Sequence, residues 1–309
     1  MIPLRKIPLR IGTRGSPLAL AQANETRERL RVTHGMSEDA FEIVIIRTTG
    51  DRVQDRSLRE LGGKGLFTRE IEEALASGAI DIAVHSMKDM PTLQPEGLAL
   101  DCFLPREDVR DAFVSPVAER LADLPEGAVV GTSSLRRRAQ LKLARPDLQV
   151  VEFRGNLQTR MKKLDEGVAA ATFLAMAGLN RLGLDHVARA AIAPEEMLPA
   201  VAQGAIGVER RADDSETAAL LAAINDAPTT LRLAAERAFL ARLDGSCETP
   251  IAGLALIEDG EIWLRGEILR PDGSERIADE GRAPLADAEA LGRDLAARLL
   301  ARAPEGFLG

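Results

Sequence analysis

The stretch "IGTRGSPLALAQA", residues 11–23, predicts how the fold begins. The apolar end of a strand runs into a short polar turn and then into a helix-forming run. Ser16 suits the N-cap of that helix, and Pro17 suits its first position, where the missing N–H would have no partner in any case. The segment "VGTSSLRRRAQL", residues 130–141, repeats this order of strand, Gly-Thr turn, hydroxyl residues and helix. The repetition predicts two similar lobes.

Strands and helices alternate through most of the chain. The segments 41–48 and 79–86 are apolar enough for strands, and the amphipathic segment 65–78 predicts a helix that ends at a glycine. In the second half, a strand over 148–156 leads into a helix over 157–167. Strands that alternate with helices are typical of parallel α/β sheets, so we expect one parallel sheet in each lobe.

The pattern changes after about residue 227. A helix is expected over 229–243, followed by antiparallel strands within 251–274 and a final helix over 287–303. Asp-Gly pairs at 259–260 and 272–273 are signals for hairpin turns. This part predicts a small α+β domain.

Composition excludes several classes of protein. The 309 residues carry a net charge of −8, which argues against a general nucleic-acid binder. Two cysteines at unrelated spacing fit a reducing compartment, and three scattered histidines argue against a zinc site. The first twelve residues lack the apolar core of a signal peptide, and the longest apolar stretch, 168–179, is too short to span a bilayer. We therefore expect a cytoplasmic protein without membrane segments.

Arginines recur where predicted strands end and helices begin. A helix N-terminus already carries partial positive charge, so a repeated choice of arginine there indicates an anionic ligand with several carboxylates or phosphates. The alternative is a set of solvated surface arginines. By the same dipole argument, replacing Arg137 with leucine is expected to leave the stability of the fold unchanged or slightly higher. The arginines in question are Arg14, Arg136, Arg137, Arg154 and Arg160.

Lys88 and Asp89 follow the predicted strand 79–86 directly. In a parallel sheet they would lie at the same edge as the arginines. The carboxylate could stabilise a cationic intermediate or move a proton, or the pair could form an ordinary surface salt bridge. His85 is interpreted as a packed residue at the end of the strand.

Three further segments are ambiguous from the residues alone. The glycine-rich "GGKGLF" lacks P-loop spacing, and its Lys64 and Phe67 could belong to a lid or to an ordinary loop and helix. Arg181 lies in a polar turn, where surface exposure is the simpler interpretation. Cys102 has apolar neighbours and is expected in the core, whereas Cys247 lies in the polar turn "LDGSCETP".

Taken together, these segments resemble the porphobilinogen deaminase (hydroxymethylbilane synthase) family of tetrapyrrole biosynthesis. The matching segments occur in the order found in the family and span nearly the whole chain. They are 13–23, 62–67, 81–91, 106–113, 131–141, 153–165, 174–183, 198–209 and 243–253.

The resemblance implies a reaction and a cofactor. Four porphobilinogen molecules condense head to tail with loss of ammonia, on a dipyrromethane cofactor held through a thioether, and water then releases hydroxymethylbilane. Cys247 matches the cysteine that carries the cofactor, and Asp89 matches the catalytic aspartate. The family needs no metal and suggests a monomer. The residues that match its carboxylate-binding arginines and their supporting donors are Arg14, Arg136, Arg137, Arg154, Arg160, Arg181, Ser16, Lys88, Thr132 and Ser134.

The resemblance also implies an architecture of two lobes like those of periplasmic binding proteins and transferrins, with the active site in the cleft between them. Its domains would be 1–104 with 200–222, then 105–199, and then a C-terminal α+β domain over 223–309 that carries the cofactor cysteine. Two residues depart from the pattern. Ala170 stands where the family usually has an aspartate, which we interpret as lost structural support, and "GSC" replaces the commoner "GGC" before Cys247.

Two other functions would account for part of this pattern. A two-lobed binding protein that sequesters an anion would show the same lobes and arginines, but it would need neither Cys247 nor Asp89. A nucleic-acid binder would use the basic segments 133–140 and 159–164, but the net charge has the wrong sign and aromatic residues are only 3%.

Overall fold

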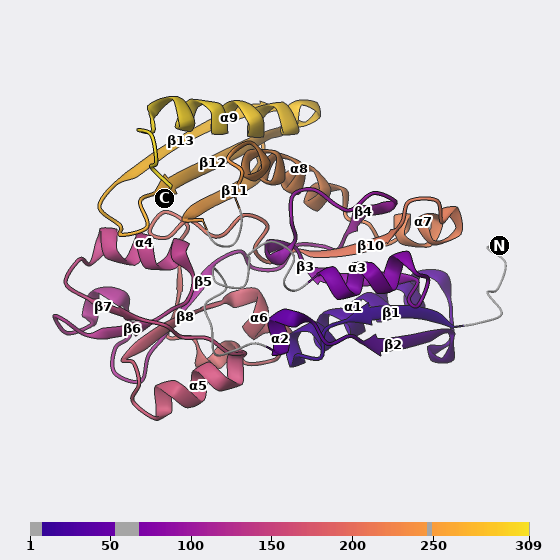
Figure 1. Ribbon diagram of the computed structural model, residues 1–309, viewed down its shortest axis with the longest axis horizontal. Coiled ribbons are helices and arrows are strands. Elements are labelled where there is room, and N and C mark those ends of the chain that lie inside the picture. Colours follow the sequence, from indigo (N-terminus) through magenta and orange to yellow (C-terminus); the bar gives the residue numbers. More distant parts are fainter. Residues whose placement is uncertain (1–7, 53–67, 246–248, 309) are drawn as a thin grey trace. The chain divides into compact units, whose positions relative to one another are not determined.

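The computed structural model describes residues 8–52, 68–245 and 249–308, which divide into two compact units (Figure 1). The first unit contains Met1–Arg106 and Ala205–Thr230, and the second contains Glu107–Gly204 and Leu231–Gly309. Each unit is therefore built from two separate stretches of the chain.

The first unit is organised around a five-stranded sheet with the order β2-β1-β3-β10-β4. β1, β2 and β3 are parallel, and β10 is antiparallel to both of its neighbours. The strand bounds are β1 Leu9–Thr13, β2 Phe41–Ile45, β3 Ile82–Ser86, β4 Leu98–Phe103 and β10 Ile206–Arg211.

Helices cover this sheet, and local signals fix where they begin and end. Ser16 caps the first helix, since its Oγ accepts a hydrogen bond from the Ala19 amide at 3.3 Å, and Gly35 ends the helix in the left-handed conformation with φ of 62°. The apolar core contains Leu9, Ile11, Leu30 and Val208. The helices are α1 Pro17–His34, α2 Thr49–Arg52, α3 Arg69–Ala76 and α7 Ser215–Ala222, with 3-10 turns η1 Glu38–Ala40 and η3 Met87–Asp89.

The second unit contains a sheet of the same design, with the order β7-β6-β8-β5-β9. Here β6 is parallel to β7 and β8, and β5 is the antiparallel strand. The strands are β5 Asp111–Val114, β6 Val129–Gly131, β7 Gln149–Val151, β8 Ala171–Ala175 and β9 Ala190–Ile192. The helices and 3-10 turns are α4 Leu135–Ala144, α5 Leu157–Asp165, α6 Met176–Arg181, η4 Leu121–Asp123 and η5 Asp185–Val187.

The C-terminal part of the second unit is a three-stranded antiparallel sheet, β11-β12-β13. Figure 1 shows α9 lying along β12 and β13. Gly266 of β12 lies against the ring of Phe239 from α8, where an added Cβ would come within 2.6 Å of the ring. The elements are α8 Ala227–Arg242, β11 Ile251–Glu258, β12 Glu261–Leu269, β13 Arg276–Pro284, η6 Leu285–Asp287 and α9 Ala288–Arg302.

The two sheets share one plan, which confirms the expected pair of similar α/β lobes with an antiparallel C-terminal part. In each sheet, one strand (β10 or β5) is inserted among four others that can be numbered in chain order. Across both sheets the order is then second, first, third, inserted strand, fourth. The expectation of purely parallel sheets is wrong in one respect, because the inserted strand, β10 or β5, runs antiparallel. The boundaries of a three-domain division stay a prediction.

Candidate functional site

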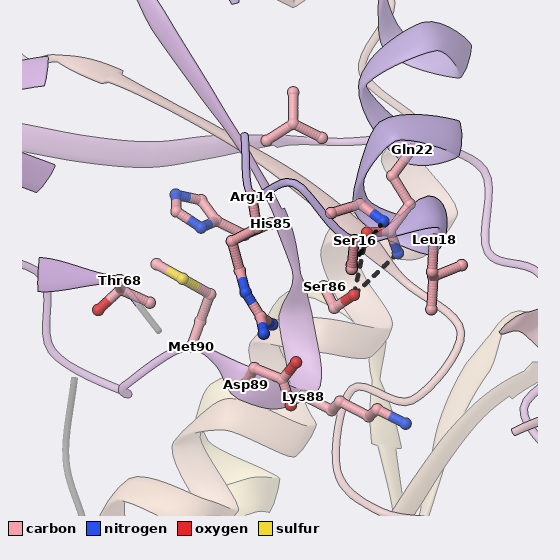
Figure 2. Close-up of a pocket in the computed structure, with 12 residues that line it drawn as sticks. Arg14, Ser16, Leu18, Gln22, Thr68, His85, Ser86, Lys88, Asp89 and Met90 are labelled. Atoms are coloured by element: carbon pink, nitrogen blue, oxygen red, sulfur yellow. Dashed lines mark hydrogen bonds between the residues drawn. The ribbon is translucent and has the colours of Figure 1, made fainter. Parts of the chain in front are cut away.

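A pocket in the first unit lies where the loops after β1 and β3 meet (Figure 2). These strands are parallel neighbours, so their carboxyl ends open at one edge of the sheet. The loop after β1 contributes Arg14 and Ser16, and the turn η3 contributes Lys88 and Asp89. All four residues were predicted from the sequence, and the structure brings them together.

Asp89 is half-buried and lines this pocket. Figure 2 shows the guanidinium of Arg14 pointing toward the Asp89 carboxylate, while the Lys88 side chain extends away from it. The pocket therefore offers one carboxylate and two cationic side chains to a small ligand. Such a set can bind a carboxylate-bearing molecule and also stabilise a positive charge that develops on it.

Gln22 and Ser86 are pocket residues that the sequence reasoning missed. Gln22 is buried on α1, and its Nε2 and Oε1 lie 2.8 Å and 3.0 Å from the Ser86 Oγ (Figure 2). This contact ties α1 to the end of β3, just before Asp89. The available signal was a glutamine on the apolar face of a helix, since a buried polar side chain needs a partner.

His85 is buried in the wall of the same pocket, as interpreted from the sequence. Its Nε2 lies 3.2 Å from Oε2 of Glu209, a buried residue of β10. The half-buried Glu72 of α3 lies nearby, and burial together with the charge of Glu209 raises the pKa of Glu72. The strand inserted into this sheet thus brings a carboxylate beneath the pocket.

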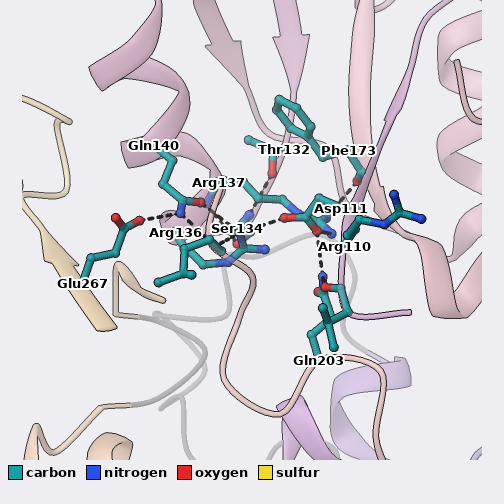
Figure 3. A network of polar contacts seen from close by, with 12 residues as sticks. Arg110, Asp111, Thr132, Ser134, Arg136, Arg137, Gln140, Phe173, Gln203 and Glu267 are labelled. Atoms are coloured by element: carbon teal, nitrogen blue, oxygen red, sulfur yellow. Dashed lines mark hydrogen bonds and ion pairs between the residues drawn. The ribbon is translucent and has the colours of Figure 1, made fainter. Parts of the chain in front are cut away.

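A second group of predicted residues lies at the start of α4 in the second unit (Figure 3). Ser134 is the N-cap of α4, and Thr132 Oγ1 accepts a hydrogen bond from the Ser134 amide at 3.2 Å. Arg136 and Arg137 lie in the first turn of α4. Both are buried, with exposed fractions of 4% and 5%, so they are not solvated surface arginines.

The two arginines share one carboxylate, Asp111, which is fully buried at the start of β5. Arg136 Nη1 lies 2.8 Å from Asp111 Oδ2, and Arg137 Nε and Nη2 donate to Oδ1 at 3.2 Å and 2.6 Å. Burial opposes ionisation of Asp111, but the two guanidinium charges outweigh it and hold its pKa well below the ordinary value. The expectation that Arg137 is dispensable for the fold is therefore contradicted, because the dipole argument did not foresee a buried counter-ion.

The arginines differ in their remaining contacts. Arg137 Nη1 donates to the carbonyl of Phe173 at 2.8 Å, so each nitrogen of this guanidinium has a partner. Arg136 Nε is buried and has no hydrogen-bond partner within the described part of the chain. Burial lowers the pKa of Arg136, although Asp111 opposes that change.

Arg154, Arg160 and Arg181 follow strands that neighbour β6. Arg154 lies between β7 and α5, Arg160 lies in α5, and Arg181 ends α6 directly after β8. Because β7, β6 and β8 are parallel, these segments open at the same sheet edge as α4. Arg160 Nε donates to the carbonyl of Gly155 at 3.0 Å, and Arg181 Nη2 donates to that of Gly204 at 3.1 Å.

Three predicted residues, Lys64, Phe67 and Cys247, lie outside the described residues. Cys102 is in the core, as expected, and burial raises the pKa of its thiol to about 12. Ala170 packs beside the apolar cluster around Phe113 and Phe173, and its carbonyl accepts a hydrogen bond from Ser115 Oγ at 2.6 Å.

Within residues 8–52, 68–245 and 249–308, no group of three or more histidine, cysteine, aspartate or glutamate side chains could hold a metal ion. Over the same residues, none of the helices has the length and apolar character needed to cross a bilayer.

Comparison with known proteins gives two matching family models and a full-length relative. The family model for the porphobilinogen deaminase dipyrromethane cofactor binding domain matches residues 9–219, and the model for the C-terminal domain of the same enzyme matches residues 230–301. The porphobilinogen deaminase of Paracoccus denitrificans (strain Pd 1222) is 70% identical over 300 residues, which cover 97% of this chain and 96% of the relative.

Solved structures with partial similarity include two bacterial periplasmic proteins. An ABC transporter periplasmic substrate-binding protein from Coxiella burnetii is 16% identical with a TM-score of 0.43, over 74% of this chain and 96% of that one. The VFT2 domain of Bordetella pertussis BvgS, as a double mutant, is 16% identical with a TM-score of 0.41, over 71% and 85% of the two chains. From the two family models and the full-length relative, we conclude that the chain belongs to the porphobilinogen deaminase family.

Proposed function

We propose that this chain carries out the porphobilinogen deaminase reaction with Asp89 as its catalytic carboxylate and with Arg14 and the arginines of the second unit as its carboxylate-binding residues. The reaction joins four porphobilinogen molecules head to tail, releases one ammonia at each step and ends with hydrolysis to hydroxymethylbilane. The observation that carries the proposal is the pocket at the ends of β1 and β3, where Asp89 and Arg14 lie together.

Asp89 suits the bond-forming step. When ammonia leaves the aminomethyl group of porphobilinogen, positive charge develops on the remaining pyrrole and methylene. The Asp89 carboxylate in a half-buried pocket can stabilise that charge more strongly than water does. It can also accept the proton that the attacking pyrrole carbon loses as the new carbon–carbon bond forms.

The arginines suit the substituents of the pyrroles. Each pyrrole carries an acetate and a propionate, so the growing product is a polyanion that needs many cationic partners. Arg14 with Ser16 and Lys88 would serve the first unit, and Thr132 and Ser134 would support the arginines of the second. Those arginines are Arg136, Arg137, Arg154, Arg160 and Arg181.

The residues present fit the dipyrromethane cofactor of the family. Arg136 Nε is a buried donor without a partner among the described residues, and a cofactor carboxylate would satisfy it. Cys247 would hold the cofactor through a thioether. When bound, the dipyrromethane supplies the nucleophilic pyrrole carbon to which the first substrate is joined.

The proposal also covers the location and the oligomeric state of the protein. We assign the chain to the cytoplasm, in line with its two cysteines at unrelated spacing, and we assign it a monomeric state. Size-exclusion chromatography with light scattering measures the second property directly.

The test is a short pulse of limiting porphobilinogen, followed by denaturing intact-mass analysis. We expect a ladder of covalent species, each heavier by one porphobilinogen less one ammonia, and matching faster bands on a native gel because every step adds two carboxylates. A protein that only sequesters anions would show a single peak after denaturation. A single peak alongside active turnover would refute growth of the product on the protein.

A further inference from the structure

A chain of hydrogen bonds joins the C-terminal sheet to the arginine pair within the second unit (Figure 3). Glu267 of β12 accepts from Gln140 Nε2 at 2.6 Å on its Oε1. Gln140 Oε1 in turn accepts from Arg136 Nη1 at 2.9 Å. Glu267 therefore contacts Arg136 through a single side chain.

The Glu267 carboxylate is one of three neighbours that fix which way the Gln140 amide faces. A carboxylate only accepts hydrogen bonds, so the amide must present its NH₂ group to Glu267. The same NH₂ group donates to the carbonyl of Leu198 at 2.9 Å. The amide oxygen is then left to face Arg136. In the reversed orientation the NH₂ group would face a guanidinium, which also only donates.

The guanidinium of Arg136 depends on this acceptor for its position. Its Nη1 lies near three oxygens, those of Gln140, Leu198 and Asp111, at 2.9, 3.0 and 2.8 Å. These contacts anchor one edge of the guanidinium and leave Nε without a partner among the described residues. Loss of the Gln140 acceptor would let the plane of the guanidinium rotate.

Burial raises the pKa of Glu267, which is only 5% exposed. The hydrogen bond from Gln140 and two cations oppose this shift and favour the charged form. Arg276 of β13 lies 3.5 Å from Glu267 Oε2, and the second cation is Arg136 of α4. Asp111 and Arg137 lie one contact further away, beyond Arg136.

We propose that Glu267 is a positioning residue for carboxylate binding, because it orients the Gln140 amide and thereby sets the Arg136 guanidinium. This proposal rests on the proposed function of Arg136. It assigns to the C-terminal sheet a part in ligand affinity that is separate from cofactor attachment.

The deciding variant is Glu267→Gln. It keeps the shape of the side chain and can hydrogen-bond to Gln140 in either amide orientation, so it removes the share of the orientation bias that Glu267 supplies and spares the packing. We expect KM for porphobilinogen to rise about three- to tenfold, which is the effect of losing one ordinary hydrogen bond, while kcat stays within about twofold. The matched control is Glu261→Gln on the exposed first residue of β12, which should match the wild-type enzyme.

The pH dependence of KM provides a readout that simple structural damage would not change. In the wild-type enzyme, protonation of Glu267 makes its carboxyl group a donor as well as an acceptor, so KM should rise toward the value of the variant as pH falls. Glu267→Gln should lack this segment of the pH profile. Thermal midpoint and the intact-mass fraction that carries dipyrromethane should stay close to wild type.

A second variant, Gln140→Met, tests the route through the amide. Its KM should rise as in Glu267→Gln, and the double variant should be no worse than Gln140→Met alone, because both changes interrupt one path. Additive effects, or an unchanged KM and pH profile in Glu267→Gln, would overturn the proposal. If Glu267→Gln fails to fold, an unchanged KM in Gln140→Met would overturn it. By contrast, Arg136→Leu with normal KM and normal cofactor loading would refute the proposed function of Arg136 itself.

Discussion

Replacement of Arg137 with leucine tests how the second unit is held together. The side chain lies in the first turn of α4, and its guanidinium donates twice to Asp111 and once to the carbonyl of Phe173. Leucine would keep the apolar stem and remove all three hydrogen bonds. Asp111 would retain Arg136 and Gln203, whose Nε2 lies 3.0 Å from Oδ1.

The expected loss of stability follows from burial. Removing one partner of a buried ion pair destabilises proteins by about 3–5 kcal/mol, because the other charge stays buried without its counter-charge. The remaining partners of Asp111 place the effect near the lower end of this range, and the Phe173 carbonyl adds to it if it stays without a donor. For a protein of this size, such a change lowers the thermal midpoint by about 6–15 °C.

Urea and thermal unfolding followed by circular dichroism measure the effect, and pH separates the ion pair from packing. The pKa of Asp111 is lower in the folded protein than in the unfolded chain. The pair therefore contributes its full stability above the ordinary aspartate pKa of about 3.9 and loses it as pH falls toward the folded value. The difference between wild type and variant should be constant at neutral pH and should shrink below about pH 4.

Arg138→Leu is the matched control, because Arg138 is the next residue of α4 and is exposed. We expect its stability to lie within about 0.5 kcal/mol of wild type. Equal stability of the two leucine variants at neutral pH would refute the argument that Asp111 depends on Arg137.

Asp89→Asn should stay folded and keep its cofactor by intact mass, yet lose about 100- to 1000-fold in kcat, because a neutral amide no longer offsets the developing cation; a near-normal rate would make Asp89 a structural residue. Cys247→Ser should lack the mass of the dipyrromethane, whereas Cys102→Ala should keep it, and the Cys102 thiol, with a pKa of about 12, should resist iodoacetamide at about pH 8 until the protein is denatured. Gly131→Ala would bring a Cβ within 2.4 Å of the Phe153 ring, so urea unfolding should show a loss of about 1–3 kcal/mol, and a stability equal to wild type would contradict the close packing at β6.

The local units of the fold could be predicted from the sequence, but their partners could not. The segments 11–23 and 130–141 contain their own signals, an N-cap serine in each and a proline in the first, and both begin a helix where expected. The segment 206–211, IGVERR, is apolar only in its first half and ends in three charged residues, so it gives little sign of a central strand. Nothing in its periodicity indicates that it pairs with β3 and β4 in the antiparallel direction.

The candidate site, too, could be predicted only in part. Arg14 and Asp89 could be predicted to lie together, because the ends of parallel strands share an edge. The burial of Arg136 and Arg137 could not be predicted, because it depends on their ion pairs with Asp111. Asp111 precedes them by more than twenty residues, and the sequence shows it only as a charged residue at the start of an apolar strand. Gln140 and Glu267 lie still further apart, and no local pattern connects them.

The inserted strand of the first unit has a consequence for synthesis on the ribosome. β10 occupies the place between β3 and β4, although about one hundred residues separate it from β4 in the chain. While those residues emerge, at roughly 5–20 per second, the edge of β3 that pairs with β10 has no partner strand. Unpaired strand edges invite association with other chains. A nascent chain halted just after Arg106 should therefore be a substrate for chaperones rather than a folded lobe.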